Sequence, residues 1–521
     1  MATVRDVTTD LLRKLGMTHV FGNPGSTELP MFRDFPADFR YILGLQESVA
    51  VAMADGHAQA TRNAALVNLH SSAGTGHALG NLFTAFKNQA PLVVTAGQQA
   101  RSILPFEPFL FAERPCEFPR PFVKWSCEPA RAADVPRAIL RGYRIAMTPP
   151  CGPVFISVPV DDWDQPCDPL DFGTLAAGNP GDPGELAQLA QALTKAHAPA
   201  LVLGAGCARQ QAWRAAIDLA EAQGMAAYVA PFASRNVFPE DHRLFRGFLA
   251  ASRESIVETL RQHDLVIAVG GPLNLYHTEG DGPHLPQGTS VWLIAEDPNL
   301  LSFAPSDRAI LADPRLALET VGRLVAPPAS RAGVLPRPPA PLVARDGPGL
   351  NDACVMEAIA RLRPAGSVVV EEAPSSRPVM QRHLPMLEPD TFYTTAGGGL
   401  GYALPASVGI ALARKEDKVI ALLGDGSAMY AIQGLFAAAR EETPVSFLIL
   451  NNRSYAALRQ FGSHFGLERV EGTDLEGLDF CALAQGHGVA ARRAATSAEL
   501  DEALQWSFTC PLPTLVEIMV A

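Results

Sequence analysis

The 521-residue chain lacks the features that mark several large classes of protein. No apolar run comes near the roughly 18 residues that a membrane span requires, and the N-terminal stretch MATVRDVTTDLLRKLGM has no apolar core of the kind found in secretory signals. Basic residues are not in excess, because 42 lysines and arginines stand against 54 aspartates and glutamates, for a net charge of −12. Such a surface offers no attractive field to a polyanion. We therefore predict a cytoplasmic protein that binds neither nucleic acid nor membrane.

Closely spaced cysteines are also absent. The eight cysteines are scattered and form no C-x-x-C pair, so we expect buried or idle thiols in a reducing compartment. Charged residues make up only 18% of the chain and hydrophobic residues 48%, which excludes a disordered or coiled-coil protein.

Short apolar runs alternate with helix-length, Ala-rich stretches in three successive blocks, a pattern typical of parallel βαβ units. The runs are 18–21, 41–45, 64–70, 91–96 and 153–158, then 200–203, 226–230, 265–269 and 291–294, then 368–371, 419–423, 445–450 and 514–518. We predict an α/β protein with three doubly wound parallel sheets, in domains 1–180, 181–330 and 349–521. The Pro-rich stretch 331–348 is predicted to be a linker. The first and third blocks have a similar order of strand-like and helix-like segments.

The strongest local motif lies in the third block. The apolar run 419–423 leads into Gly424-Asp425-Gly426-Ser427, and the next run along the chain ends in Asn451-Asn452. Ligands of parallel sheets bind beyond the carboxyl ends of the strands, so both motifs are expected at one sheet edge. The glycines allow close approach of a diphosphate, and carboxylate and amide oxygens suit Mg²⁺. Taken alone, Gly-Asp-Gly is more simply a turn and Asn-Asn a strand cap, but the pair, each after a buried strand, favours the binding site.

Candidate polar residues follow three apolar runs of the first block. Asn23, Gly25 and Ser26 follow the first run, Glu47 precedes a very apolar helix, and His70 comes directly before a predicted glycine loop at 71–76. Glu47 is either an acid tuned for proton transfer or a carboxylate that favours the positive end of its helix. His70 is either an acid/base group or a hydrogen-bonded core histidine.

The second block has only a weak nucleotide signal. Gly204-x-Gly206 follows an apolar run, but the third glycine of the dinucleotide fingerprint is absent, and no acid suited to a ribose follows the next run. We interpret this block as a structural domain, with a vestigial nucleotide fold as the alternative. His277 is a further histidine of interest, although a surface loop position is the simpler interpretation.

Taken together, the motifs resemble those of the thiamin diphosphate-dependent 2-keto acid decarboxylases, and more closely the benzoylformate branch than the pyruvate branch. The resemblance rests on the Gly-Asp-Gly and Asn-Asn motifs and on FGNPGSTELP, LQESVAVAMADGHAQA, NLHSSAGTG, RPFVKWSCEPA and TTAGGGLGYALPA, and it covers essentially the whole chain. It implies pyrimidine-binding, middle and diphosphate-binding domains, with thiamin diphosphate and Mg²⁺ as cofactors. It also implies an active site between two subunits, hence a homodimer at least and usually a homotetramer.

The resemblance assigns roles to individual residues of this sequence. Asp425, Asn452 and the backbone oxygen of Ser454 match the Mg²⁺ ligands. The cofactor-binding positions are Asn23, Gly25, Glu47, Ser375, Gly398, Leu400, Gly424, Asp425, Gly426, Ser427, Tyr430, Asn452, Ser454 and Tyr455. The catalytic positions are Glu47, Ser26, His70 and His277. The substrate-pocket positions are Phe109, Leu110, Leu458 and Phe461.

The implied reaction is the non-oxidative decarboxylation of an aromatic or bulky 2-keto acid, such as benzoylformate, to an aldehyde and CO₂. The paired histidines of the pyruvate branch are replaced here by His70-Ser71. Three residues depart from the benzoylformate pattern: Pro374 lacks a hydroxyl and an N–H, Arg453 is large for its position, and Phe109 is bulkier than leucine.

Three alternatives share the same cofactor motifs. One is a carboligating synthase of the acetolactate type, which usually binds a flavin. Another is an acyl-CoA lyase, for which Arg209 and Arg214 are weak candidates for a nucleotide site. The last is a paralogue that binds the cofactor without catalysis.

Overall fold

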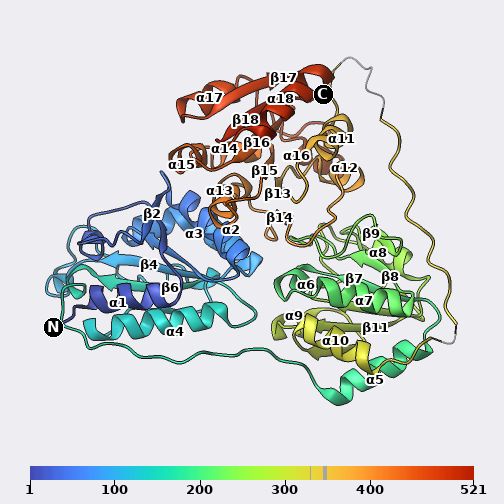
Figure 1. Cartoon of the computed structure of the whole chain (residues 1–521), viewed down its shortest axis with the longest axis horizontal. Coiled ribbons are helices and arrows are strands. Elements are labelled where there is room, and N and C mark those ends of the chain that lie inside the picture. Colours follow the sequence, from blue (N-terminus) through green and yellow to red (C-terminus); the bar gives the residue numbers. More distant parts are fainter. Residues whose placement is uncertain (329, 344–348, 521) are drawn as a thin grey trace. The chain divides into compact units, whose positions relative to one another are not determined.

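The computed structural model describes residues 1–328, 330–343 and 349–520 and contains three six-stranded sheets flanked by helices (Figure 1). The described residues form two compact units. The first unit comprises residues 1–175, 343–379 and 394–521, and the second comprises 176–342 and 380–393. The predicted fold class, an α/β protein with three doubly wound parallel sheets, is confirmed.

The first sheet lies in the N-terminal part of the first unit and has the strand order β2-β1-β3-β4-β6-β5. Helices α1 and α4 cover one face, and α2 and α3 cover the other (Figure 1). Its strands are β1 (His19–Gly22), β2 (Arg40–Leu43), β3 (Ala65–Leu69), β4 (Leu92–Gln98), β5 (Ser126–Cys127) and β6 (Val154–Pro159). Its helices are α1 (Val4–Lys14), α2 (Glu47–Thr61), α3 (Ser71–Asn88) and α4 (Val135–Met147), with short 3₁₀ turns η1 (Leu29–Phe32), η2 (Leu104–Phe106), η3 (Arg120–Phe122), η4 (Ala132–Asp134) and η5 (Val160–Asp162).

The C-terminal sheet repeats this topology, with the order β14-β13-β15-β16-β18-β17, which confirms that the first and third blocks share a layout. Its strands are β13 (Val368–Glu372), β14 (Phe392–Thr394), β15 (Val419–Gly424), β16 (Val445–Asn451), β17 (Ala490–Ala494) and β18 (Thr514–Met519). The helices are α11 (Asp352–Leu362), α12 (Arg377–His383), α13 (Ala403–Ala413), α14 (Asp425–Met429), α15 (Gly434–Arg440), α16 (Ala456–His464), α17 (Phe480–Gly486) and α18 (Ser497–Thr509). In both sheets the strand order reverses beside the first strand, which is where ligands bind in open α/β sheets.

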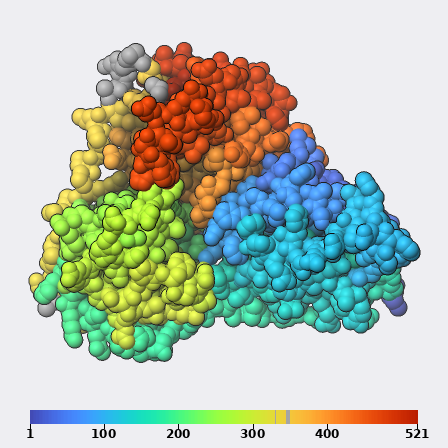
Figure 2. Space-filling view, turned by 180° about the vertical axis from the view of Figure 1, so that it is seen from behind, coloured from blue at the N-terminus to red at the C-terminus, as the bar shows by residue number. Residues whose placement is uncertain are grey.

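The middle sheet has a different order, β12-β11-β10-β7-β8-β9, which is the arrangement of dinucleotide-binding folds. The green-to-yellow part of the chain forms it (Figure 2). Its strands are β7 (Pro199–Leu203), β8 (Ala226–Val229), β9 (Phe245–Phe248), β10 (Leu265–Val269), β11 (Ser290–Ala295) and β12 (Arg308–Leu311). Its helices are α5 (Pro183–Lys195), α6 (Ala205–Arg209), α7 (Trp213–Gln223), α8 (Arg253–Leu260), α9 (Pro298–Phe303) and α10 (Pro314–Leu324). Alternate side chains of β7 and β10 enter two separate apolar cores, one on each face.

Two details of the elements differ from the sequence prediction. The segment 71–76 is not a glycine loop but the start of helix α3, so His70 is the N-cap residue of a helix. Strands β5, β9, β12, β14 and β17 were not predicted, and each lies at an edge of its sheet. Of the predicted linker 331–348, residues 344–348 lie outside the described residues, and residues 331–343 form no helix or strand.

Within the described ranges, no helix combines the length and the apolar character needed to cross a bilayer. All eight cysteines are free thiols.

The two sheets of the first unit are joined through the tight contact of α2 with α13. A β-carbon on Gly409 would stand 1.8 Å from the carbonyl oxygen of Met53, and one on Gly56 would stand 2.2 Å from that of Ala406. The two helix backbones can therefore approach this closely only where side chains are missing. Beside the contact, Gln59 donates hydrogen bonds to Asp55 (2.5 Å) and to the Tyr402 hydroxyl (3.0 Å), which places polar groups in an otherwise apolar interface.

Replacing Gly409 with Ala is expected to destabilise the protein by about 1–3 kcal/mol, because the added methyl group forces the two helices apart. The matched control is Gly80→Ala in α3, where an added β-carbon meets nothing within 4 Å. Ala is the better helix former there, so we expect unchanged or slightly raised stability. Thermal melts followed by circular dichroism measure both effects, and equal melting temperatures for the two variants would contradict the proposed packing constraint.

Candidate functional site

The segments that follow β1, β2 and β3 carry the polar residues predicted in the first block. Glu47 begins α2 and is buried. The Asn23 amide lies 3.4 Å from Glu47 Oε1, and His77 Nδ1 lies 3.2 Å from Glu47 Oε2. Gly74 faces the same carboxylate, since a β-carbon there would stand 3.2 Å from Glu47 Oε1. Glu47 is therefore a buried carboxylate with both oxygens next to polar partners.

His70 is held by a neighbouring carboxylate that the sequence analysis did not identify. Its Nδ1 lies 3.0 Å from Glu28 Oε2 and 3.2 Å from the Thr27 hydroxyl. Glu28 is 2% exposed, and its Oε1 accepts a hydrogen bond from the Gly97 N–H at 2.9 Å. As a carboxylate, Glu28 accepts the hydrogen bond with His70, and Nδ1 of His70 donates it. The Nε2 atom is then left to exchange a proton with another group.

Two glycines make this arrangement possible. A β-carbon on Gly25 would fall 2.0 Å from His70 Nδ1, and one on Gly97 would fall 2.1 Å from Glu28 Oε1. Ser71, which follows His70, has a φ of +44°, a conformation that non-glycine residues rarely adopt. Such strain persists only where the surrounding structure enforces it. Ser26 lies on the Gly25 loop and is exposed.

The C-terminal sheet brings the predicted metal ligands together. Asp425 begins α14 after β15, and Asn452 follows β16. The Ser454 N–H donates to Asp425 Oδ2 (3.2 Å) and to Asn452 Oδ1 (3.0 Å), so the two side-chain oxygens converge on one point of the backbone. Burial raises the pKa of Asp425, while four backbone N–H groups act in the opposite direction. The structure thus brings a carboxylate and an amide oxygen close together, and these are ligand types that suit a hard divalent cation such as Mg²⁺.

The predicted diphosphate cradle surrounds these ligands. Gly424 ends β15, and Gly426 and Ser427 lie in the first turn of α14. A β-carbon on Gly426 would stand 2.2 Å from the Tyr455 ring, so the glycine leaves space for that ring. Tyr430 caps the end of α14 and is 61% exposed.

The glycine-rich loop 397–401 is attached to β13 by Glu372. This carboxylate, 2% exposed, accepts hydrogen bonds from the N–H groups of Gly401 (2.6 Å), Tyr402 (2.8 Å) and Ala403 (2.6 Å). Burial raises the pKa of Glu372 to about 7, against the effect of these donors. Gly398 and Leu400 lie on the loop, and Gly398 has a φ of +69°. The loop is thereby fixed at its C-terminal end.

The departures from the benzoylformate pattern lie on turns and at the surface. Pro374 and Ser375 form the turn between β13 and α12, with Pro374 exposed. Arg453 has a φ of +56° in the loop that carries the metal-ligand candidates. Of the predicted pocket residues, Phe109 is 86% exposed and Leu458 is 53% exposed, while Leu110 and Phe461 are half-buried. Phe109 and Leu458 are therefore not core residues of the single chain.

Among the described residues, no hydrogen bond or ion pair joins the set around Glu47 and His70 to the set around Asp425 and Asn452. His277 belongs to the second unit. Its ring packs edge-on against Phe232 at a centroid distance of 5.8 Å, and the backbone N–H of His277 donates to the Ala251 carbonyl.

In the second unit, the glycines that follow β7 pack closely against the backbone of the loop that follows β10. A β-carbon on Gly204 would stand 2.5 Å from the Gly271 Cα, and the Gly206 N–H donates to the Gly270 carbonyl at 2.8 Å. Arg209 lies 3.7 Å from the buried Glu296, and Arg214 pairs with Asp218 at 2.8 Å. The Gly206 N–H and both arginine side chains therefore have partners within the protein, and the interpretation of this block as a structural domain stays a prediction.

Comparison with known proteins places this geometry in a family. Models for the N-terminal TPP-binding, central and C-terminal TPP-binding domains of thiamine pyrophosphate enzymes match residues 2–110, 186–321 and 375–518. The chain therefore belongs to the thiamine pyrophosphate enzymes. It is 43% identical to benzoylformate decarboxylase of Pseudomonas aeruginosa, with 99% of each chain covered.

Two solved structures share the whole fold. One is benzoylformate decarboxylase from Polynucleobacter necessarius, with a TM-score of 0.98 and 38% identity over 100% of this chain and 99% of the other. The other is a thiamine diphosphate-dependent 4-hydroxybenzoylformate decarboxylase from Rhodococcus jostii RHA1, with a TM-score of 0.96, 38% identity and the same coverage.

Replacing Glu28 with Gln is expected to lower kcat by about 10- to 100-fold, because an amide that donates toward Nδ1 favours the wrong tautomer of His70. The Michaelis constant should change much less, since Glu28 touches His70 rather than substrate. Steady-state kinetics on benzoylformate measure both constants. The control is Glu113→Gln, whose side chain is 79% exposed. A Glu28→Gln variant with the wild-type kcat would exclude the positioning role.

Proposed function

We propose that the protein is a thiamin diphosphate- and Mg²⁺-dependent carboxy-lyase that converts an aromatic or bulky 2-keto acid, such as benzoylformate, into an aldehyde and CO₂. The observation that carries this proposal is the convergence of the Asp425 and Asn452 oxygens on the Ser454 backbone, directly after two neighbouring strands. The names of the relatives supply the substrate class, since all three act on benzoylformate or its 4-hydroxy derivative.

Each predicted residue has a distinct task in this proposal. Asp425, Asn452 and the Ser454 carbonyl hold Mg²⁺, and Gly424, Gly426 and Ser427 border the diphosphate. The cofactor, when bound, supplies the electron sink for the carbanion that CO₂ loss leaves behind. Other cofactor contacts are proposed for Asn23, Gly25, Ser375, Gly398, Leu400, Tyr430 and Tyr455.

The titratable residues of the proposal handle protons and substrate. Glu47 would share a proton with the pyrimidine ring of the bound cofactor, at a position that is buried from water. The Ser26 hydroxyl donates to the substrate carboxylate. His70 exchanges a proton at Nε2, since Nδ1 is tied to Glu28, and His277 is proposed as a second proton carrier. Phe109, Leu110, Leu458 and Phe461 are proposed to surround the substrate side chain, where an apolar environment favours loss of charge as CO₂ leaves.

We further propose that two chains complete each active site, so that a homodimer is the smallest active form and a homotetramer is expected. Two observations support this. The Glu47 set and the Asp425 set are not bonded to each other in the described part of one chain, and large apolar side chains such as Phe106 (80%), Phe109 and Phe465 (65%) are exposed. The domain boundaries at 180, 330 and 348 and the cytoplasmic location belong to the same proposal.

The alternatives receive less support from the geometry. A flavin-binding synthase or an acyl-CoA lyase needs a nucleotide site in the second unit, where the glycines after β7 pack against a neighbouring loop and both candidate arginines have acidic partners. A non-catalytic paralogue would not need the pairing of half-buried His70 with the buried Glu28.

Purified protein supplied with benzoylformate, thiamin diphosphate and Mg²⁺ is expected to release CO₂ and form benzaldehyde, and omission of either cofactor after chelation should abolish turnover. A coupled aldehyde assay with parallel CO₂ detection measures both products. Turnover that persists without added cofactors in a chelated, dialysed sample would contradict the proposal, as would tight cofactor binding without turnover of any aromatic 2-keto acid.

Replacing Glu47 with Gln is expected to lower kcat by about 100-fold or more, in the range of general acid–base contributions, with the fold intact. The reason is that Gln cannot hold the shared proton. Glu107→Gln on the exposed 104–107 turn serves as the control. A Glu47→Gln variant that works at nearly the wild-type rate would remove Glu47 from the mechanism.

A further inference from the structure

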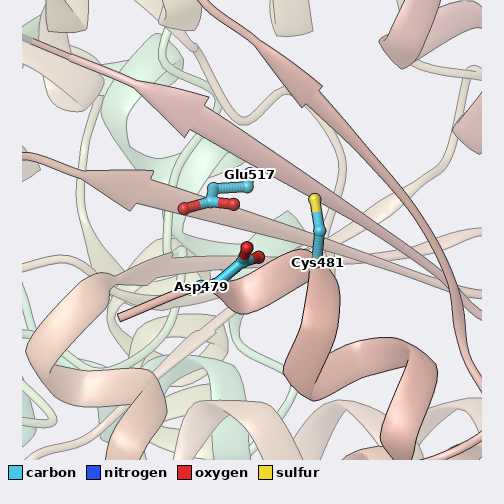
Figure 3. Close-up of side chains that lie close together, drawn as sticks. All are labelled: Asp479, Cys481 and Glu517. Carbon is cyan, nitrogen blue, oxygen red and sulfur yellow. The ribbon is translucent and has the colours of Figure 1, made fainter. Parts of the chain in front are cut away.

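A cluster of metal-ligand types lies at the edge of the C-terminal sheet, apart from the proposed Mg²⁺ site. Asp479, Cys481 and Glu517 place one ligand atom each within 4.8 Å of one another (Figure 3). Asp479 and Cys481 lie at the start of α17, and Glu517 lies in the middle of β18. The residue types alone would suit a small divalent ion, so the contacts of each group decide the role of the cluster.

The guanidinium group of Arg493 already supplies the positive charge in this cluster. Arg493 of β17 places Nη2 3.0 Å from Asp479 Oδ1 and 2.9 Å from Glu517 Oε2. Burial beside Glu517 raises the pKa of the Cys481 thiol to about 11, so the thiolate that a metal requires is disfavoured. Glu517 has no exposed surface, and a buried carboxylate is tolerated only when it is paired. Arg493 is therefore its counter-ion.

The second oxygen of Glu517 is connected to the metal-ligand loop by hydrogen bonds through Asn451. Glu517 Oε1 accepts a hydrogen bond from the Asn451 side-chain amide at 2.7 Å. The Asn451 side-chain oxygen in turn accepts the N–H of Arg453 at 3.1 Å. Arg453 has a φ of +56°, and its carbonyl accepts the N–H of Leu475 at 2.9 Å. The strained residue between Asn452 and Ser454 is thus fixed through Asn451, and Asn451 is fixed through Glu517.

We propose that Glu517, neutralised by Arg493, is a positioning residue for Mg²⁺: by orienting Asn451 it holds the left-handed backbone at Arg453 and so keeps Asn452 and Ser454 aligned with Asp425. This inference rests on the proposed function, because it assumes that the loop binds Mg²⁺. Residues behind metal ligands commonly change metal affinity by about 10- to 100-fold when they are replaced.

The test measures Mg²⁺ binding rather than turnover. Full-length protein is freed of metal with a chelator and dialysed, and Mg²⁺ is titrated by calorimetry at saturating thiamin diphosphate. Glu517→Gln is expected to raise the Mg²⁺ dissociation constant at least about tenfold, because an amide cannot accept from Asn451 and pair with Arg493 as well. The matched control is Asp479→Asn, which alters the other partner of Arg493 but has no link to Asn451. Asn is also a good N-cap, so less than a twofold change is expected.

A second variant guards against misfolding of Glu517→Gln. Asn451→Ala should weaken Mg²⁺ binding similarly. The double variant should lose clearly less binding free energy than the sum of the two single losses, because both residues act through one contact. Additive losses in the double variant would overturn the proposal, as would unchanged Mg²⁺ affinity in both single variants. A second divalent ion bound per chain and lost in Asp479→Asn would also overturn it. Wild-type protein that binds no Mg²⁺ would instead refute the proposed function.

Discussion

Buried carboxylates that accept hydrogen bonds from loops are the interaction on which the site depends. Glu28 holds the N–H of Gly97 and the ring of His70, Glu372 holds three successive N–H groups at the glycine-rich loop, and Glu517 holds Asn451 beside the metal-ligand loop. None of the three is among the residues proposed to touch cofactor or substrate. Each fixes a loop that carries such residues, which a loop at the end of a strand cannot achieve with backbone hydrogen bonds alone.

The carboxylates can act in this way only because both of their oxygens are satisfied. Removing a carboxylate from water is unfavourable by several kcal/mol unless hydrogen bonds or an opposite charge replace the water. Glu372 meets this condition with backbone donors at the start of α13, and Glu517 meets it with Arg493 and Asn451. Glu28 additionally needs Gly97, because a side chain there would occupy the position of the carboxylate. The geometry of each loop therefore depends on its buried carboxylate, and the carboxylate in turn depends on its hydrogen-bond donors and, for Glu28, on a neighbouring glycine.

The central strands of each sheet can be predicted from the sequence more readily than the edge strands or the buried carboxylates that hold the loops. Strands such as β15 and β16 are buried on both faces and appear as unbroken apolar runs, with Asp425 and Asn452 directly after them. The edge strand β17 reads Ala-Ala-Arg-Arg-Ala and β12 is mostly exposed, so neither has an apolar pattern to detect. The roles of Glu28 and Glu517 could not be predicted from the sequence, because their partners, Gly97 and Asn451, lie far away along the chain. Glu28 follows Ser26 so closely that the stretch resembles an ordinary turn.

The three sheets show that topology alone does not determine what a strand end can bind. The first and third sheets share one strand order, yet one presents titratable groups, Glu47 and His70, and the other presents oxygen ligands, Asp425 and Asn452. The middle sheet has the strand order of a dinucleotide fold, but Gly204 and Gly206 pack closely against the backbone of Gly270 and Gly271. Glycines that would admit a diphosphate in another protein here admit a second loop. A glycine at the end of a strand thus makes room for a ligand in one sheet and for a neighbouring loop in another, depending on which backbone packs beside it.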